Sequence, residues 1–259
     1  MKKQAAYGNE SISSLKGADR VRKRPAVIFG SDGIEGCEHS IFEILSNSID
    51  EAREGYGSRI IVTRYEDQSV EVEDFGRGIP VDYNTKEQRF NWELLFCELY
   101  AGGKYNNDAD ESYEYSLGLN GLGLCSTQYA SEYMDVDIRR DGVQYLLHFE
   151  KGENVGGLKK ESYSKKDTGT RIRWKPDLEV FTDIHVPVEY FLDIIKRQAI
   201  VNDGVTFVFR NQVGNQFETT EFCYQNGIVD HVKEIAGEDA LTSVQFWQTE
   251  RKVRDRDDK

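Results

Sequence analysis

The chain has 259 residues, of which 38% are hydrophobic and 31% charged, and this composition excludes collagen-like and wholly disordered proteins. With 33 Lys and Arg against 46 Asp and Glu, the formal net charge is −13, so the chain alone is not expected to bind DNA tightly. No apolar run reaches the ~20 residues of a transmembrane helix, and four scattered cysteines favour reduced thiols in a cytoplasmic protein with no membrane partner.

The first predicted segment is a polar N-terminal arm over residues 1–25. Its end carries a basic cluster, which we expect to be solvated, at Arg20, Arg22, Lys23 and Arg24. From residue 36 to residue 55 the pattern changes, because Ile41, Leu45 and Ile49 recur every fourth position. This spacing predicts a helix with one buried face.

The next segments predict a β-hairpin, with strands over 59–65 and 69–74 and a polar turn over 66–68. A short apolar helix is predicted over 92–99, followed by a polar, acidic loop at 106–114. Further strands are expected at 134–139, 143–149, 170–174 and 205–210, with a helix at 188–201. The mixture of strands and helices indicates an α/β or α+β fold with one layered sheet.

The C-terminal part, from about residue 217, is predicted to begin a second module. Nine of the ten side chains over 250–259 are charged, so this stretch cannot contribute to a packed core. We therefore expect a charged tail at the end of the chain.

Polar side chains share one face of the predicted helix at about 100° per residue. They are His39, Glu43, Asn47 and Asp50. Carboxylate and amide oxygens suit Mg²⁺ when nucleotide phosphates and water complete its coordination, and a histidine one turn before Glu43 could orient it as a general base. A merely solvated acidic face is the plainer alternative.

Two glycine-containing turns add to this pattern. Asp74 leaves a strand into a turn with Gly76 and Gly78, where a flat ligand can approach the backbone and Asp74 can accept a hydrogen bond from an exocyclic amine. Glycines at 118, 121 and 123 precede a helix candidate and offer backbone N–H groups to phosphate. Lys104 could add a positive charge. An ordinary turn and a solvated lysine are the alternatives.

Taken in order, these motifs resemble the GHKL ATPase family, and within it the ATPase domains of gyrase-type topoisomerase B subunits. The resemblance covers about residues 7–210, and its motifs, taken together, are specific for this family. The segments that carry it are Leu15-Lys16-Gly17, Val21-Arg22-Lys23-Arg24-Pro25, Phe42 to Ala52, Asp74 to Pro80, Ala101-Gly102-Gly103-Lys104 and Thr168-Gly169-Thr170.

The resemblance implies catalytic roles for Glu43, as the general base, and His39, as its partner. It implies that Asn47 is the Mg²⁺ ligand, that Asp74 reads adenine with help from Thr170, and that Tyr7 and Ile12 reach across to a second protomer. The whole set of nucleotide-binding residues that it implies is Asn47, Asp50, Glu51, Asp74, Arg77, Gly78, Ile79, Pro80, Lys104, Tyr113, Gly118, Leu119, Asn120, Gly121, Leu122, Gly123 and Thr170.

The fold that the resemblance implies is a two-layer α/β (α+β) sandwich of the Bergerat type, with a mixed, largely antiparallel sheet and helices on one face. The ATPase domain would span 26–216, and 217–259 would begin a truncated transducer domain. The expected function is ATP binding and hydrolysis with Mg²⁺ in a type II DNA topoisomerase. ATP would close a homodimer through the arm, and a gyrase A-type subunit and DNA would be partners of the full-length protein.

The glycine loop departs from the family pattern G-G-L-H-G-V-G, since Leu117 replaces its first glycine and Asn120 its histidine. This departure favours a divergent paralogue. Three alternatives therefore stay open: an ATP-gated clamp without topoisomerase activity, a GHKL protein kinase, and a structural paralogue that has lost the nucleotide. A phosphoacceptor histidine helix, which a kinase would need, is not found in the sequence.

Overall fold

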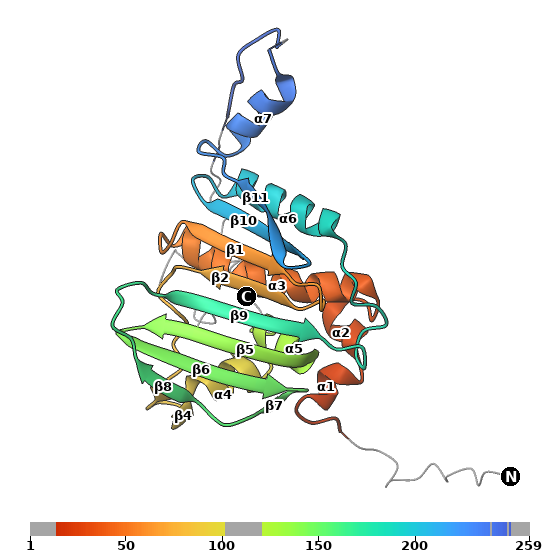
Figure 1. The fold of residues 1–259 in the computed structure, drawn as a ribbon, viewed down its shortest axis with the longest axis vertical. Coiled ribbons are helices and arrows are strands. Elements are labelled where there is room, and N and C mark those ends of the chain that lie inside the picture. Colours follow the sequence, from red (N-terminus) through yellow and green to blue (C-terminus); the bar gives the residue numbers. More distant parts are fainter. Residues whose placement is uncertain (1–13, 102–120, 239, 248, 250–259) are drawn as a thin grey trace, which may run out of the picture.

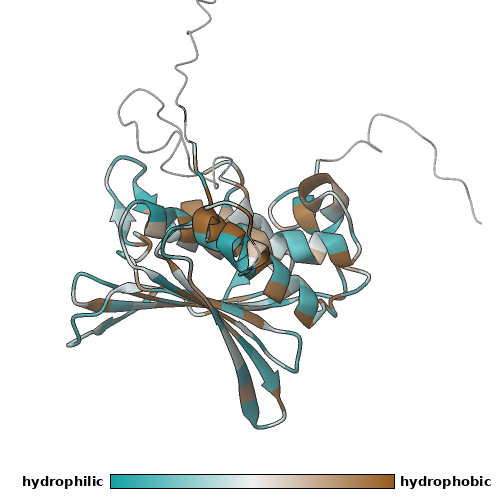
Figure 2. Cartoon of the chain, turned by 90° about the horizontal axis from the view of Figure 1, so that it is seen from above, coloured by the Kyte–Doolittle hydropathy of each residue, from teal (hydrophilic) through white to brown (hydrophobic). Residues whose placement is uncertain are grey.

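The computed structural model describes residues 14–101, 121–238, 240–247 and 249. A single large sheet forms one layer, and the helices that pack on it lie on one of its faces (Figure 2). This arrangement confirms the predicted two-layer fold with a mixed, largely antiparallel sheet.

The large sheet contains nine strands within the described residues, and β1 pairs parallel with β10 whereas the other pairs are antiparallel. Two further short strands, β3 (Tyr83–Asn84) and β4 (Arg89–Phe90), form a separate ribbon. In spatial order the large sheet runs β11 (Gln216–Phe222), β10 (Thr206–Val213), β1 (Arg59–Arg64), β2 (Val70–Asp74), β9 (Gly169–Pro176), β5 (Ser131–Arg140), β6 (Val143–Glu150) and β7 (Glu153–Asn154), with β8 (Lys159–Ser162) also paired to β6.

The longest helix, α3, crosses behind the middle of the sheet, and α7 extends beyond the β11 edge (Figure 1). In chain order the helices are α1 (Asp19–Arg22), α2 (Pro25–Phe29), α3 (Ile34–Arg53), α4 (Asn91–Cys97), α5 (Gly123–Tyr129), α6 (Val188–Val201) and α7 (Ile228–Ala236).

Helix α3 packs against the sheet through the apolar stripe that the sequence predicts. Ile41, Leu45 and Ile49 are all buried. Gly36, in the first turn, permits close packing, because a Cβ atom there would lie 2.1 Å from the carbonyl oxygen of Ser31. The apolar stripe thus fixes which face of α3 remains available for polar chemistry.

Strand β2 sets the direction of its last side chain by simple alternation. Val70, Val72 and Asp74 point to the buried face, and Glu71 and Glu73 to the other face. Side chains in a strand alternate between the two faces, so an aspartate in register with two core valines must enter the layer between sheet and helices. Asp74 is accordingly only 7% exposed.

Several predicted elements lie where the sequence places them, including the hairpin of β1 and β2 and the helix α6. The basic cluster differs from the solvated arm that we expected, because Val21 of α1 is fully buried and Arg22 is bonded to Asp177. Strand β11 begins at Gln216 and joins the same sheet through β10, so the sheet continues across the predicted domain boundary at 216/217, which itself stays a prediction.

Candidate functional site

Glu43 and His39 form a pair on the partly exposed face of α3. The Nε2 atom of His39 lies 3.0 Å from Oε1 of Glu43, and the two side chains are 43% and 30% exposed. The Nδ1 atom of His39 lies 3.2 Å from the carbonyl oxygen of Phe29. The two contacts fix the ring between the backbone of α2 and the carboxylate, with Nε2 facing Glu43.

Asn47 follows Glu43 by one helical turn. Its Nδ2 atom donates to the backbone carbonyl of Glu43 at 3.1 Å. This contact uses the amide nitrogen, so the amide oxygen remains available as a ligand for a hard cation. Asp50 lies further along the same side of α3 but is only 4% exposed, so in this structure it forms part of the wall rather than of the open face.

Asp74 is held between α3 and the sheet by three donors. Its Oδ1 atom accepts from the backbone N–H groups of Gly76 at 3.0 Å and Thr170 at 3.2 Å, and its Oδ2 atom accepts from the Ser48 hydroxyl at 2.9 Å. Burial raises the pKa of the Asp74 carboxyl, while these hydrogen bonds act in the opposite direction. The result is a preorganised carboxylate in a mostly apolar wall.

Arg77 and Glu51 close one side of the turn that follows Asp74. The Nε and Nη2 atoms of Arg77 donate to Oε1 and Oε2 of Glu51 at 2.7 and 2.8 Å, and Nη2 also bonds to Glu54. Tyr56 stacks against the guanidinium, with 3.8 Å from Cζ to the ring centre. Burial raises the pKa of the Glu51 carboxyl, but the bonds from Arg77 outweigh this effect and hold the pKa below its ordinary value.

The turn itself requires glycine at Gly76 and Gly78. A Cβ atom on Gly76 would lie 2.2 Å from Cγ of Glu51. Gly78 has a φ of +79°, and a Cβ there would lie 2.8 Å from the carbonyl oxygen of Arg139. The N–H of Ile79 donates to the Thr170 hydroxyl at 3.2 Å, so the turn is tied to β9. Pro80, directly after Ile79, is exposed.

Helix α5 approaches α3 at Gly123. A Cβ atom at this position would lie 2.0 Å from Oε2 and 2.9 Å from Cβ of Glu43, so a larger residue would displace the Glu43 side chain. Gly121 has a φ of +58°, and Leu122 directly precedes the helix. The backbone of 121–123 therefore lies beside the Glu43 carboxylate.

Other predicted site residues lie outside the described part of the chain. They are Lys104, Tyr113, Gly118, Leu119 and Asn120, together with Tyr7 and Ile12 of the arm. Within the described part, Asp74 and Thr170 meet at Ser48 between α3 and the sheet, whereas Glu43 and Asn47 lie on the partly exposed face of the same helix. Their assignment to nucleotide binding remains a prediction.

Sequence reasoning missed two residues that the structure places at this site. Ser48 donates to Asp74, and Nη1 of Arg140 donates to the carbonyl oxygen of Gly78 at 2.7 Å. Arg140 is 62 positions from Gly78, and no local spacing predicts that contact. Ser48 could have been found from its position one turn before Glu51 and Ala52, on the side of α3 nearest the sheet.

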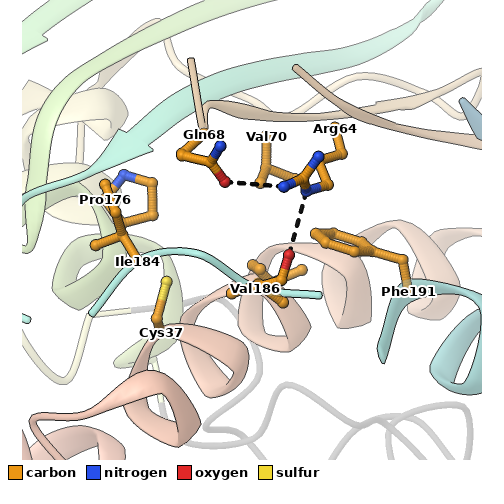
Figure 3. A pocket seen from close by; sticks show the side chains of 9 residues that line it. Cys37, Arg64, Gln68, Val70, Pro176, Ile184, Val186 and Phe191 are labelled. Atoms are coloured by element: carbon orange, nitrogen blue, oxygen red, sulfur yellow. Dashed lines mark hydrogen bonds between the residues drawn. The ribbon is translucent and has the colours of Figure 1, made fainter. Parts of the chain in front are cut away.

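A narrow crevice elsewhere in the molecule contains none of these residues. Cys37 of α3 and Phe191 of α6 contribute to its lining (Figure 3). Arg64 closes it, donating from Nε to the carbonyl oxygen of Val186 at 3.2 Å and from Nη2 to Gln68 at 3.0 Å. Burial raises the pKa of the Cys37 thiol to about 12, so this cysteine is a poor nucleophile. We interpret the crevice as a packing feature.

Among the residues that the structure describes, no group of three or more His, Cys, Asp or Glu side chains could hold a metal ion. A cation at Asn47 would therefore need most of its ligands from phosphate and water. None of the helices in the described ranges has the length and apolar composition needed to cross a membrane.

Comparisons with known proteins find similarity over most of the chain. The sequence profile of "Histidine kinase-, DNA gyrase B-, and HSP90-like ATPase" matches residues 34–180. The B subunit of DNA gyrase from Thermotoga maritima is 37% identical over 249 residues, which are 96% of this chain and 38% of that protein. The B subunit of DNA topoisomerase 4 from Salmonella typhimurium is 35% identical over 229 residues, 88% of this chain and 35% of that protein.

Two solved structures are similar in fold. The 43K ATPase domain of Thermus thermophilus gyrase B, in complex with an aminocoumarin, gives a TM-score of 0.72 at 30% identity, covering 86% of this chain and 56% of that one. The ATP-binding domain of Francisella tularensis topoisomerase IV, in complex with a small-molecule inhibitor, gives 0.70 at 31% identity, covering 86% and 58%.

The chain spans less than two fifths of the length of these curated relatives. The similarity is nevertheless continuous over most of the chain and includes α3, the turn after Asp74 and the start of α5. Because the family profile covers more than half of the residues, the chain belongs to the family of histidine kinase-, DNA gyrase B- and HSP90-like ATPases.

Proposed function

We propose that this chain binds Mg·ATP between α3 and the sheet and hydrolyses it, as the ATPase domain of a gyrase-type (type II) topoisomerase. The observation that carries the proposal is the buried Asp74 carboxylate, held by three donors where Ser48 of α3 meets the sheet, on the same helix as the Glu43–His39 pair. Ser48 follows Glu43 by five residues of α3. A ligand that used both would have a hydrogen-bond donor at one end and an electrophile at the other.

The Asp74 end suits adenine. Each carboxylate oxygen has about two acceptor sites, and Oδ2 uses only one of them for the Ser48 hydroxyl. The exocyclic amine of adenine can donate to the remaining site. Ile79 is partly exposed beside the turn and offers an apolar surface to the ring, and the Arg77–Glu51 pair fixes the backbone around it.

The Glu43 end suits the terminal phosphate. A carboxylate oriented by His39 can accept a proton from water as that water attacks phosphorus. Between Glu43 and Ser48, the residue of α3 that bonds to Asp74, the helix rises about 7.5 Å at 1.5 Å per residue, so the two carboxylates are far enough apart to contact different parts of one ligand. Asn47 lies between the two ends, and its amide oxygen would hold Mg²⁺, whose charge would neutralise the phosphates.

The proposed role in the whole protein follows from the relatives. The B subunits of gyrase and of topoisomerase IV are similar along most of this chain. We therefore propose that ATP joins two copies through the N-terminal arm, and that an A-type subunit and DNA are the partners of a cytoplasmic topoisomerase. An ATP-gated clamp without strand passage is the alternative.

Nucleotide binding is tested by titrating the chain calorimetrically with a non-hydrolysable Mg·ATP analogue. We expect Asp74→Asn to weaken binding at least about tenfold, because an amide nitrogen cannot accept the adenine amine proton. Glu73→Gln is the matched control, since Glu73 is the neighbouring residue on the opposite face of β2, paired with Arg139 at 2.8 Å. Equal affinities for Asp74→Asn and wild type would refute the adenine role.

Hydrolysis is tested with Glu43→Ala. This variant should retain analogue binding and lose roughly 10²-fold or more in turnover, as expected when a general base is removed. Glu35→Gln, in the first turn of the same helix, is the control. Unchanged turnover in Glu43→Ala would place the base elsewhere.

Size-exclusion chromatography with the analogue, with and without DNA, separates a topoisomerase-type dimer from a clamp that closes without DNA.

A further inference from the structure

Arg22 differs from the other basic residues of its cluster. Its side chain is 14% exposed and bonds to three acceptors far away in sequence. Within the described ranges, Lys23 pairs with the nearby Asp19, and Arg20 bonds to the carbonyl oxygen of Leu15. The Arg22 acceptors are the carbonyl oxygen of Tyr129 at 3.1 Å, Asp177 Oδ2 at 2.6 Å and Glu179 Oε2 at 3.0 Å. A guanidinium that donates to several acceptors at once holds the segments that carry those acceptors together.

One of the segments that Arg22 holds is the C-terminal end of α5. Tyr129 is the last residue of this helix, and its carbonyl has no partner within the helix. The Arg22 guanidinium donates a hydrogen bond to this carbonyl, and its positive charge interacts favourably with the negative end of the helix dipole. The next carbonyl, that of Ala130, accepts from the N–H of Asp177 at 3.0 Å. Arg22 and the segment at 177 together fix where α5 ends.

The other end of α5 lies at the Glu43 carboxylate. A Cβ on Gly123 would lie 2.0 Å from Oε2 of Glu43, so α5 cannot move toward α3 without displacing that side chain. Between the two ends, the Thr127 hydroxyl donates to the carbonyl oxygen of Ser40 at 3.3 Å. The seven residues of α5 span about 10 Å. A short helix is stiff, so a shift at Tyr129 moves Gly123 as well.

We infer that Arg22 is a positioning residue for the phosphate end of the nucleotide site. It acts through α5, whose placement sets both the backbone at Gly121 to Gly123 and the space around Glu43. Arg22 itself contacts neither end of the site. This inference rests on the proposed function, because the phosphate contacts of 121–123 are part of it. The adenine end, built on β2 and β9 around Asp74, is independent of α5 and should not respond.

The test compares two ligands in the same variants. Affinity for a non-hydrolysable Mg·ATP analogue is measured by calorimetry, and affinity for adenosine by ligand-observed NMR. We expect Arg22→Gln to lower the affinity for the analogue about tenfold and to change the affinity for adenosine by less than about twofold. The reason is that a displacement of the α5 backbone by about 1 Å is costly where several groups must contact the phosphates together. Arg20→Gln, on the exposed side of the same helix, should leave both unchanged.

The outcomes separate this inference from the proposed function. No binding of either ligand to the wild-type chain would refute the proposed function and the inference with it. If wild type binds both ligands and Arg22→Gln loses the same factor in affinity for each, the variant is generally destabilised and only the inference is overturned. Unchanged affinities of Arg22→Gln for both ligands would also overturn only the inference. Should Arg22→Gln fail to fold, Arg22→Lys decides. It keeps the charge beside Asp177 but lacks the planar fork, and an unchanged analogue-to-adenosine ratio would overturn the inference.

Discussion

Two carboxyl groups at the site have pKa values shifted in opposite directions. Burial raises the pKa of Asp74, which faces neutral donors. Burial also acts on Glu51, but the guanidinium of Arg77 outweighs it and lowers the pKa. The difference arises because Asp74 is the more deeply buried of the two and faces neutral donors, whereas Glu51 also bonds to a positive charge. Asp74 therefore stabilises the fold less as pH rises, whereas Glu51 stabilises it more.

The Glu51–Arg77 pair predicts a pH dependence of stability. Because the folded pKa of Glu51 lies below its unfolded value, its contribution is complete above about pH 4.5 and is lost as pH falls through the folded pKa. Arg77→Gln should lower the free energy of unfolding at pH 7 by about 1 kcal/mol or less, since Arg77 is 44% exposed and screened by solvent.

Urea unfolding of wild type and Arg77→Gln at pH 7 and at pH 3 measures this difference. The gap between the two proteins should shrink at the lower pH. Lys86→Gln, at an exposed position outside α3, serves as a second variant for the effect of changing net charge. A gap that is constant with pH would contradict the lowered pKa of Glu51.

Single residues were predictable where a local pattern reports on chemistry. Glu43 and His39 are separated by one helical turn, and the structure places them 3.0 Å apart. Ser48, Arg22 and Arg140 were not predicted as site or positioning residues, because their contacts join positions that are 26, 155 and 62 residues apart. Such contacts depend on the sheet order, which a single sequence does not specify.

Among the elements, α3 shows how far periodicity reaches. The repeat of Ile41, Leu45 and Ile49 predicts both the helix and its buried face, although the helix begins at Ile34 rather than at Gly36 and ends at Arg53. The short helices α1 and α2 were not predicted, because four or five residues cannot show a repeat. The start of α5 was predicted from its glycines, but its contact with Glu43 was not.

That contact predicts the effect of Gly123→Ala. The new methyl group would collide with Oε2 of Glu43, and the end of this flexible side chain would have to move. We expect turnover to fall at least about tenfold. Stability should change by less than about 1 kcal/mol, because alanine is a better helix former than glycine.

Steady-state hydrolysis and thermal unfolding of the purified variant separate the two effects. Gly33→Ala, at the N-cap of α3, is the matched control, since its Cβ would come no closer than 3.1 Å to Glu35. Wild-type turnover in Gly123→Ala would show that the position of Glu43 tolerates the displacement and would argue against the base role.

At the scale of the whole molecule, the sequence predicts one mixed sheet with helices on one face, and the structure confirms it. The strand order could not be predicted, because β1 pairs with β10 across almost 150 residues of chain. That pairing is parallel and places α6 beside α3. The C-terminal region was expected to begin a second module, yet Phe222 and Tyr224 pack against the same core.

The position of β11 predicts how the chain tolerates shortening. Removal of residues 216–259 would delete β11 and the contacts of Phe222 and Tyr224 with the core, so we expect the free energy of unfolding to fall by about 2 kcal/mol or more. Removal of 228–259 would delete α7, which has no fully buried residue. Its His231 packs edge-on against Tyr224, and its Glu234 is bonded to Lys196 at 2.9 Å and to the Tyr224 hydroxyl at 2.6 Å.

Exposed ion pairs of that kind contribute little, so the second truncation should cost less than about 1 kcal/mol and should retain binding of the ATP analogue. Urea unfolding of both truncated chains, beside calorimetry of the longer one, measures the difference. If the two truncations were equally stable, β11 would be dispensable to the sheet, and a domain boundary at 216/217 would be favoured. A large loss on removing only 228–259 would instead show that the apolar side of α7, with Ile228, Val232 and Ile235 exposed in this structure, contributes to folding.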